Sequence, residues 1–270
     1  MENHDLYRNI LDELWLDSRI QMNELANKLP RSSQTISKMK TSLWEKHIIH
    51  SPTILLNPLS MDLQIIFMEI KTNPSEPSVL SGLSNIPQIT SIDGILGNFS
   101  LFVKFEVPNK GDFASILHEF DQNFATGSRF NSYRIIEALD IYKIGGFPIR
   151  IPDRVEKLSA KEYNLLRILR KNHNPRKWPI RNENYLSINQ KDLEFLLKLN
   201  LSREISQLLE KQVVQEFTIS LGEYSGELNA KFYVRIHPQN IGDYQCLAQD
   251  LIENPHIIDL YRTGEEAGLL

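Results

Sequence analysis

The chain has 270 residues and a formal net charge of −4, from 30 Lys and Arg against 34 Asp and Glu. This balance excludes a wholly basic nucleic-acid coat protein but leaves room for a local basic face. Apolar residues make up 41% and charged residues 24%. These fractions are close to the globular average and argue against disorder, collagen-like repeats and coiled-coil rods. A chain of this length is expected to form about two domains.

Cysteine usage and hydropathy favour the cytoplasm as the compartment. Cys246 is the single cysteine in the sequence, which excludes an internal disulfide and a multi-cysteine zinc site. The first residues are polar and lack the apolar core of a signal peptide. No apolar run approaches the roughly 20 residues that a bilayer span requires. We therefore expect a soluble cytoplasmic protein with no membrane partner.

Residues 4–50 have the apolar periodicity of three short helices. Pro30 ends the second helix, because proline disfavours the helical conformation in the residue before it. Ser32 or Ser33 is expected to cap the third helix, since a serine oxygen accepts hydrogen bonds from the first turn of a helix. That third helix is predicted to run to about His47.

After the third helix we expect two short strands, 48–50 and 53–56, joined at Ser51-Pro52. Three helices, a tight turn before the third and a small β-wing are typical of a winged helix-turn-helix, here assigned to residues 1–60. The outward face of the third helix offers hydroxyl, amide and cationic groups that can reach phosphates and base edges. The candidate DNA-binding residues are Ser32, Ser33, Gln34, Thr35, Ser37, Lys38, Lys40 and Thr41. The alternative at this point is the solvated face of a protein-binding module.

Residues 61–146 are expected to form a second domain of a different kind. The predicted elements are a strand at 63–70, a helix at 74–85, strands at 89–95 and 99–107, a helix at 112–124 and a strand at 130–144. This βαββαβ order predicts an α+β fold, a ferredoxin-like sandwich with two helices on one face of an antiparallel sheet. The open sheet face needs a cover, for which another subunit is the usual solution. The segment has no catalytic or metal-binding motif, so we expect neither catalysis nor a cofactor.

The second half is expected to repeat the first in shortened form. It is divided into a linker at 147–158, a second helix-turn-helix-like domain at 159–222 and a partial second sandwich at 223–270. The predicted elements are a capped helix from Ser159, helices at 190–198 and from 202, a wing at 213–220, a strand at 230–236, a helix at 241–252 and a strand at 256–261. The basic residues between Arg167 and Arg181 are either a phosphate-contacting patch or a solvated loop.

The order of several loose motifs carries a family resemblance over residues 4–144. The motifs are Leu11-x-x-Leu14-x-x-Asp17-x-Arg19, Glu24-Leu25-Ala26, Ser32, Leu43, Ile48-Ile49, Asn57-Pro58 and Gly97-Asn98-Phe99-Ser100-Leu101. With them the chain resembles the Lrp/AsnC, or feast/famine, regulator family. The resemblance implies transcription regulators that bind double-stranded DNA, assemble as homodimers or higher oligomers through their sandwich domains, and bind small effectors between subunits.

The resemblance also suggests where an effector would bind and where this chain departs from its relatives. Gly97, Asn98 and Ser100 are the candidate effector-binding residues, because a glycine turn with open N–H groups can hold a carboxylate. Ser100 stands where the family has an aspartate, which disfavours an ordinary amino-acid effector. Met39 replaces a common arginine, and His47 replaces the glycine that follows the third helix.

Three functions from different classes remain open from the sequence. The leading one is a sequence-specific DNA-binding transcription regulator that needs no catalysis. The second is a tetrapyrrole-binding decarboxylase of the same architecture, for which His118 and Arg134 in the sandwich are the candidate ligands, without a clustered histidine and arginine signature. The third is an adaptor whose helix-turn-helix units bind protein.

Overall fold

The structure is a computed structural model that describes residues 3–72, 77–124, 132–155, 157–170, 200–221, 231–238, 240–265 and 268–270. These residues form two compact units, and each unit draws on both halves of the sequence. Of the described residues, 3–57, 157–170, 200–221 and 231–232 belong to the first unit, and those between 58 and 155 and from 233 to 270 belong to the second. No helix in the described ranges has the length and apolarity needed to cross a bilayer.

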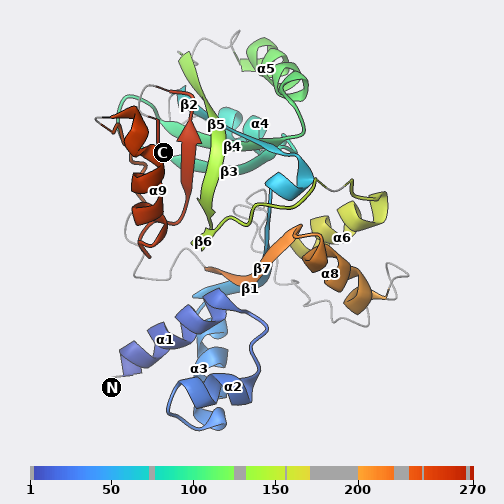
Figure 1. The fold of residues 1–270 in the computed structure, drawn as a ribbon, viewed down its shortest axis with the longest axis vertical. Coiled ribbons are helices and arrows are strands. Elements are labelled where there is room, and N and C mark those ends of the chain that lie inside the picture. Colours follow the sequence, from blue (N-terminus) through green and yellow to red (C-terminus); the bar gives the residue numbers. More distant parts are fainter. Residues whose placement is uncertain are drawn as a thin grey trace. The chain divides into compact units, whose positions relative to one another are not determined.

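The first unit begins with the three expected helices (Figure 1). These are α1 (Asn3–Leu16), α2 (Met22–Lys28) and α3 (Ser33–Glu45). Ser32 is the N-cap of α3, as the sequence indicates, and accepts a hydrogen bond from the Thr35 N–H. Apolar side chains from all three helices and from a strand of the second half form one core; its buried members are Leu6, Ile10, Leu14, Ile20, Leu25, Leu29, Ile36, Met39, Leu43, Ile49 and Ile219.

The prediction of a β-wing at residues 48–56 is wrong. Residues 48–56 do not fold back at Ser51-Pro52, because β1 (Ile49–Leu56) is one continuous strand. Its antiparallel partner is β7 (Val214–Leu221), which the sequence placed in a second wing. Pro52 is tolerated inside β1 because each strand of a two-stranded ribbon has one edge that makes no ladder hydrogen bonds. The ribbon therefore joins the two halves of the chain.

Two helices of the second half complete the first unit. They are α6 (Ala160–Arg170) and α8 (Leu201–Glu210). The expected capping box at the start of α6 is present: the Ser159 N–H donates to Glu162 Oε2 over 2.7 Å, and the Glu162 N–H donates to Ser159 Oγ over 3.3 Å. The predicted helix at 190–198 and the basic residues 171–181 lie outside the described part of the chain.

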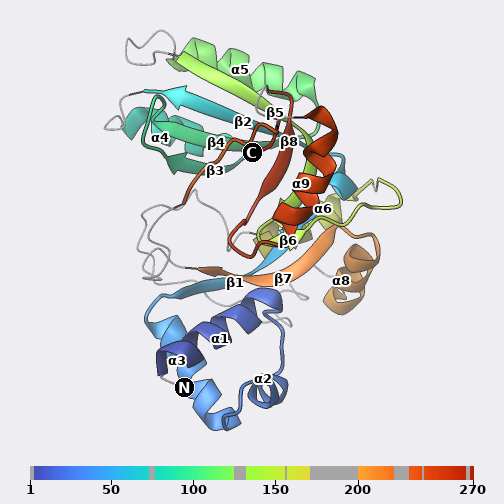
Figure 2. The same cartoon turned by 60° about the vertical axis from the view of Figure 1, so that its left-hand side comes forward.

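One helix of each half packs on the strand of the other half. Helix α1 contacts β7, whereas α6 contacts β1, and Figure 2 shows α1 beside the paired strands. At the α1–β7 contact, Thr218 Oγ1 donates to the Trp15 carbonyl over 2.7 Å, and the Arg19 guanidinium lies 3.6 Å from the centre of the Phe217 ring. Because these contacts cross between the halves, the N-terminal helices and the described helices of the second half form one folded body.

The second unit contains the expected ferredoxin-like βαββαβ order. Its elements are β2 (Gln64–Lys71), α4 (Pro77–Ser84), β3 (Ile89–Gly94), β4 (Leu101–Val107), α5 (Lys110–Phe124) and β5 (Ser132–Ile144), preceded by the 3₁₀ turn η1 (Leu59–Met61) and followed by β6 (Phe147–Pro148). The sheet order is β3-β4-β2-β5-β6. Helices α4 and α5 cover one face, where Ile66, Met68, Val103, Phe105 and Phe113 are buried.

The other sheet face is covered by the chain's own C-terminal segment. The Tyr233 ring lies 4.1 Å from the Phe102 ring, and the Tyr261 ring lies 4.9 Å from the Phe67 ring, measured between centroids. The second subunit that we expected on this face is therefore replaced by residues of the same chain. Phe105 lies on the other face, where its ring packs against Phe113 of α5.

The C-terminal elements differ in detail from the sequence prediction. Residues 231–235 form no strand, and Ile236 makes only an isolated bridge to Leu269. The predicted helix at 241–252 divides into the 3₁₀ turn η4 (Ile241–Asp243) and α9 (Tyr244–Ile252). The last strand, β8 (Leu260–Thr263), begins later than expected, because its register is set by pairing with β5.

A buried lysine fixes α9 to the sheet. Lys143 on β5 is 3% exposed, and its ammonium group donates to the carbonyls of Ile252 and Asn254 over 2.8 and 2.9 Å. Burial lowers the pKa of Lys143, and the nearby Glu253 opposes that shift. A cation at the C-terminal end of a helix satisfies carbonyls that the helix leaves open.

The capping carboxylate of α6 predicts a pH-dependent stability for the first unit. Burial would raise the pKa of Glu162, but hydrogen bonds from Lys211 and Ser159 outweigh it and hold the pKa below its ordinary value. This stabilisation is present above the unfolded pKa and is lost as the pH falls through the folded one. We expect Glu162→Gln to lower the free energy of unfolding by roughly 1–3 kcal/mol at neutral pH, and by less near pH ~4.

Urea unfolding of wild type and variant at the two pH values measures this difference. Glu210→Gln is the control, since Glu210 is an exposed carboxylate on α8 and its removal should cost less than ~0.5 kcal/mol. A difference between wild type and Glu162→Gln that stays constant on acidification would contradict the assignment.

The internal cover of the sandwich also predicts the assembly state. We expect the intact chain to be a monomer of 31.3 kDa, because both β1 and the Phe67–Phe102 face are covered from within. A fragment of residues 1–150 exposes both surfaces and should dimerise, since soluble monomers rarely leave such apolar patches open. Light scattering at matched concentrations measures the molar mass of both proteins. A dimeric intact chain would overturn the prediction.

Candidate nucleic-acid interface

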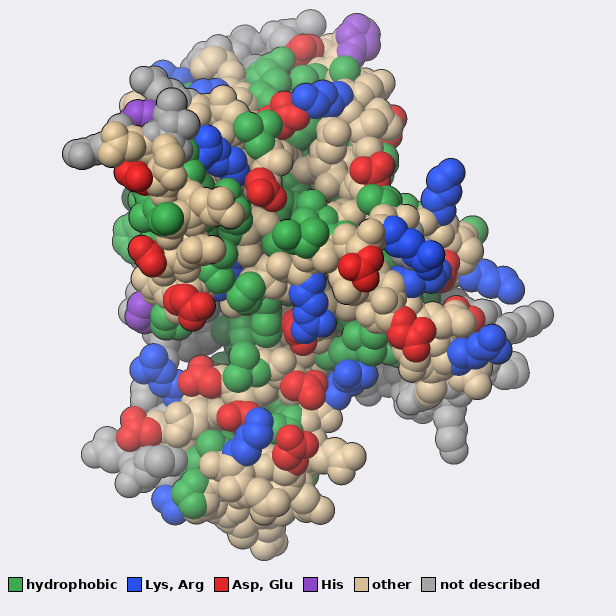
Figure 3. Space-filling view, viewed as in Figure 1, with side chains coloured by type: hydrophobic (Ala, Val, Ile, Leu, Met, Phe, Trp, Pro, Cys, Tyr) green, Lys and Arg blue, Asp and Glu red, His purple; other side chains and the backbone are tan. Residues whose placement is uncertain are grey.

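Helix α3 has an exposed polar stripe opposite its buried face. Gln34, Ser37, Lys38 and Thr41 are all exposed and follow the spacing i, i+3, i+4 and i+7, which places them on one side of a helix. On the opposite side, Ile36, Met39 and Leu43 are buried in the core. Figure 3 shows mostly uncharged polar surface at the end of the unit formed by α2 and α3. The stripe thus presents amide, hydroxyl and ammonium groups on a rigid support.

The serines at the start of α3 hold the turn between α2 and α3. Ser32 Oγ lies 2.9 Å from Thr35 Oγ1 and accepts from the Thr35 N–H over 3.2 Å. Ser33 Oγ donates to Asn23 Oδ1 on α2 over 3.4 Å. These three hydroxyls therefore have structural roles in addition to the DNA contacts predicted for them. They orient the exposed stripe relative to α2.

The lysines near α3 differ in how accessible they are. Lys38 is exposed, whereas Lys40 is half-buried and burial lowers its pKa. Lys46, just after the helix, is exposed and lies 5.5 Å from the Tyr7 ring. Lys28 on α2 is held by Glu13 at 2.7 Å. Lys38 and Lys46 are thus better placed for phosphates than Lys40.

Two departures from the family pattern have structural explanations. His47 adopts a left-handed conformation with φ of 55°, the region that glycine enters most easily, which fits the glycine that the family resemblance implies at this position. Met39 is 8% exposed and lies in the core. The presence of methionine in place of the arginine that the family resemblance implies therefore removes no group from the exposed stripe.

The candidate effector turn is a six-residue loop, longer than the connection at 96–98 that the predicted strand bounds imply. Strand β3 ends at Gly94, and strand β4 begins at Leu101. Within the loop, the Ile95 N–H donates to the Ser100 carbonyl over 2.9 Å. The Ser100 N–H donates to the Ile70 carbonyl over 2.8 Å, and its hydroxyl donates to the Thr72 carbonyl over 2.5 Å. Both Ser100 donors are therefore engaged, while Gly97, with φ of 143°, and Asn98 are exposed.

Four charged side chains next to this loop pair with one another. Arg134 contacts Glu69 at 2.6 Å and Glu265 at 3.4 Å, and Arg235 contacts the same two carboxylates at 2.8 and 3.2 Å. Glu69 is 7% exposed, so this pairing neutralises a buried charge on the sheet face that the C-terminal segment covers. The arginines are occupied by structural ion pairs.

His118 does not join Arg134 in one site. It is exposed on α5, where its Nε2 lies 2.8 Å from the Gln122 amide. Helix α5 packs on the opposite face of the sheet from the Arg134–Glu69 pair, because α5 side chains pack with the alternating β2 residues Ile66 and Met68. The two residues proposed as tetrapyrrole ligands therefore lie on different faces.

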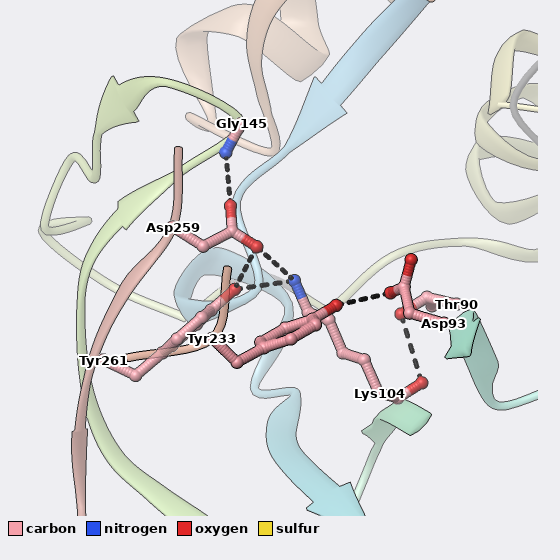
Figure 4. A network of polar contacts seen from close by, with 7 residues as sticks. All are labelled: Thr90, Asp93, Lys104, Gly145, Tyr233, Asp259 and Tyr261. Carbon is pink, nitrogen blue, oxygen red and sulfur yellow. Dashed lines mark hydrogen bonds and ion pairs between the residues drawn. The ribbon is translucent and has the colours of Figure 1, made fainter. Parts of the chain in front are cut away.

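A buried polar network fixes the C-terminal segment to the sheet (Figure 4). Lys104 donates to the Tyr261 hydroxyl over 2.7 Å, and that hydroxyl donates to Asp259 over 3.2 Å. The Tyr233 hydroxyl donates to Asp93 over 2.5 Å. Burial, followed by the neighbouring carboxylates, raises the pKa of both tyrosines, which stay protonated. Within the described ranges no group of His, Cys, Asp and Glu has the geometry of a metal site.

Comparison with known proteins identifies the family. No protein-family model matches the chain. The leucine-responsive regulatory protein of Klebsiella pneumoniae is 30% identical over 117 residues, which are 42% of this chain and 71% of that protein. This chain belongs to the Lrp/AsnC family. The leucine-responsive regulatory protein of Escherichia coli K12 is 29% identical over the same length and shares.

Solved structures similar to the Lrp/AsnC chain include regulators and one enzyme. AsnC of E. coli aligns with a TM-score of 0.44 and 24% identity, over 50% of this chain and 91% of its own. The siroheme decarboxylase NirDL aligns with a TM-score of 0.49 and 13% identity, over 79% of this chain and 65% of its own. The family shown by the leucine-responsive regulatory protein agrees with the resemblance drawn from the sequence.

The hydrogen bonds of Ser100 predict a structural role for this side chain. Ser100→Ala removes the donor to the Thr72 carbonyl and should lower the free energy of unfolding by about 0.5–1.5 kcal/mol. Asn98→Ala is the matched control in the same exposed loop and should change stability by less than ~0.5 kcal/mol. Urea unfolding measures both. A free amino acid that raises the melting temperature of wild type but not of Ser100→Ala would speak against this role.

Proposed function

We propose that this Lrp/AsnC chain is a transcription regulator that binds double-stranded DNA through α3. The observation that carries the proposal is the exposed stripe of Gln34, Ser37, Lys38 and Thr41 on a helix whose other side is buried and whose start is capped. A helix of this kind fits the major groove of DNA, and a rigid support fixes its register. The relatives named above are regulatory proteins, which supports the same function.

Each group of the stripe has a distinct role in this proposal. Lys38 and Lys46 contact phosphates and supply most of the affinity, with Lys40 contributing less because it is half-buried. The Gln34 amide matches the donor and acceptor edge of adenine, and Ser37 and Thr41 contact base edges or phosphates. Ser32, Ser33 and Thr35 lie at the helix start, where N–H groups favour a phosphate. No catalytic step is part of this function.

The two other functions receive less support from the structure. The decarboxylase function requires histidine and arginine at one tetrapyrrole site, whereas His118 and Arg134 lie on opposite faces and Arg134 is held by Glu69 and Glu265. An adaptor function leaves the match between the α3 stripe and nucleic acid unexplained. We propose the cytoplasm, with the DNA, as the location of the protein. Because both Ser100 donors are engaged, an effector carboxylate at the 95–100 loop would bind through other donors.

The accessibility of the lysines predicts unequal effects on DNA binding. Lys38→Ala should weaken binding across all sequences and make the dependence of affinity on salt shallower by roughly 0.9 in the log–log slope, the value for one phosphate contact. Lys40→Ala should have a smaller effect because its ammonium group is half-buried. Electrophoretic mobility shifts against the protein's own promoter region, in a salt series, measure both.

Lys71→Ala is the matched control for these two variants. Lys71 is exposed at the end of β2 in the second unit and has the same charge and side chain. Its removal should leave affinity and salt slope unchanged. Equal binding by wild type and the Lys38→Ala, Lys40→Ala double variant would refute α3 as the DNA-binding helix.

A further inference from the structure

The segment α8–β7 aligns with α3–β1 without a gap. Each of its residues stands 165 positions after a counterpart in the first half, so that Glu210-Lys211-Gln212-Val213-Val214 matches Glu45-Lys46-His47-Ile48-Ile49. Both helices end in the same way. His47 and Gln212 share the left-handed conformation, with φ of 55° and 56°. The N–H groups of Ile48 and Val213 donate to the carbonyls five residues earlier, Leu43 and Leu208.

The pairing of β1 with β7 relates the two copies by a local twofold axis. Thr53 pairs with Thr218, its own counterpart, and on either side Pro52 pairs with Ile219 and Ile54 with Phe217. Such reciprocal pairing is the pattern of an interface between two identical surfaces. Because the strands are antiparallel and each recognition-type helix precedes its own strand, α3 and α8 belong to opposite ends of the ribbon.

Helix α8 carries exposed groups similar to three of the four in the α3 stripe. Ser37, Lys38 and Thr41 have Ser202, Arg203 and Ser206 as their counterparts: a hydroxyl, a cation and a hydroxyl at the same spacing. All three α8 residues are exposed, whereas Leu201 and Leu208 on the other side are buried. Asn200 caps the helix by accepting from the Arg203 N–H over 3.1 Å. The α8 stripe therefore has the hydroxyl and cationic groups of α3 on a buried support, but it lacks the amide, because Leu199 is the counterpart of Gln34.

We propose that α8 is a second DNA-reading helix, so that one chain reads two unlike half-sites of double-stranded DNA arranged as an imperfect inverted repeat. This inference rests on the proposed function of α3. Paired helices related by a twofold axis contact half-sites about one helical turn, or a multiple of it, apart. In this protein a single chain supplies both helices.

The two half-sites are unequal because the two helices differ at defined positions. Ile205 and Glu204 replace Lys40 and Met39, so α8 has one cation fewer and one carboxylate more. Lys211, the counterpart of Lys46, is held by Glu162 at 2.7 Å and contributes less to phosphate binding. Helix α8 also begins at Leu201, one turn later in this register than α3. We therefore assign the tighter half-site to α3 and the weaker one to α8.

The test uses the full-length protein and a pool of random-sequence DNA duplexes that span several helical turns. Sequences retained by wild type are determined, and the number of chains on each duplex is measured by native mass spectrometry. The selection is repeated with Lys38→Ala and Arg203→Ala, with Lys71→Ala as the control. Circular dichroism checks that the variants stay folded, which is expected because all three side chains are exposed.

The expected result is one chain per duplex that contains two half-sites. Arg203→Ala should bind about fivefold or more weakly and lose sequence preference in one half-site only, while Lys38→Ala weakens binding more strongly and affects the other. A single half-site, with Arg203→Ala indistinguishable from wild type, overturns the inference but leaves the proposed function standing. If wild type enriches no sequence and binds none of the pool, the proposed function itself fails.

Discussion

The antiparallel pairing of β1 with β7 is the contact on which the first unit depends. A two-stranded ribbon alone is marginal in water, so its stability must come from what packs on it. Here α1 packs on the strand of the second half and α6 on the strand of the first, and Ile219 enters the core of the first three helices. Removing either half would leave an exposed strand edge and an incomplete core. The ribbon and the helices therefore stabilise one another across the two halves.

The second unit also has a surface that needs a cover. In this unit the surface is a sheet face and not a strand edge. Its open face carries Phe67 and Phe102 beside Glu69, an arrangement that cannot remain in water or be covered by purely apolar groups. The C-terminal segment supplies Tyr233 and Tyr261 for the rings and Arg235 for the carboxylate. The hydroxyls of both tyrosines find acidic partners in Asp93 and Asp259. This matching of polar groups specifies how the segment sits on the sheet.

The structural features that the sequence predicts most accurately are those determined by residues close together in the chain. Pro30 and Ser32 mark the boundary between α2 and α3 through local backbone chemistry, and the helix face with Ile36, Met39 and Leu43 follows from periodicity alone. The exposed stripe, and thus most of the candidate site, is visible from the same pattern. The wing was misplaced because the partner of Thr53 is 165 residues away, and the apolar sequence of β1 is the same for either pairing. The engagement of Ser100 by Thr72 likewise depends on a strand end that no local motif signals.

The Thr53–Thr218 register has a consequence for how such a regulator responds to its own abundance. Two copies held in one polypeptide stay together at any dilution, because their effective concentration is set by the linkage and not by the amount of protein in the cell. Occupancy of an operator would then rise in simple proportion to the number of chains, without the steep threshold that reversible dimerisation imposes. Two copies joined in this way are also free to diverge. Under the proposal that α3 and α8 read unlike half-sites, a bound chain would have a defined orientation on DNA and would distinguish the upstream from the downstream side of a promoter.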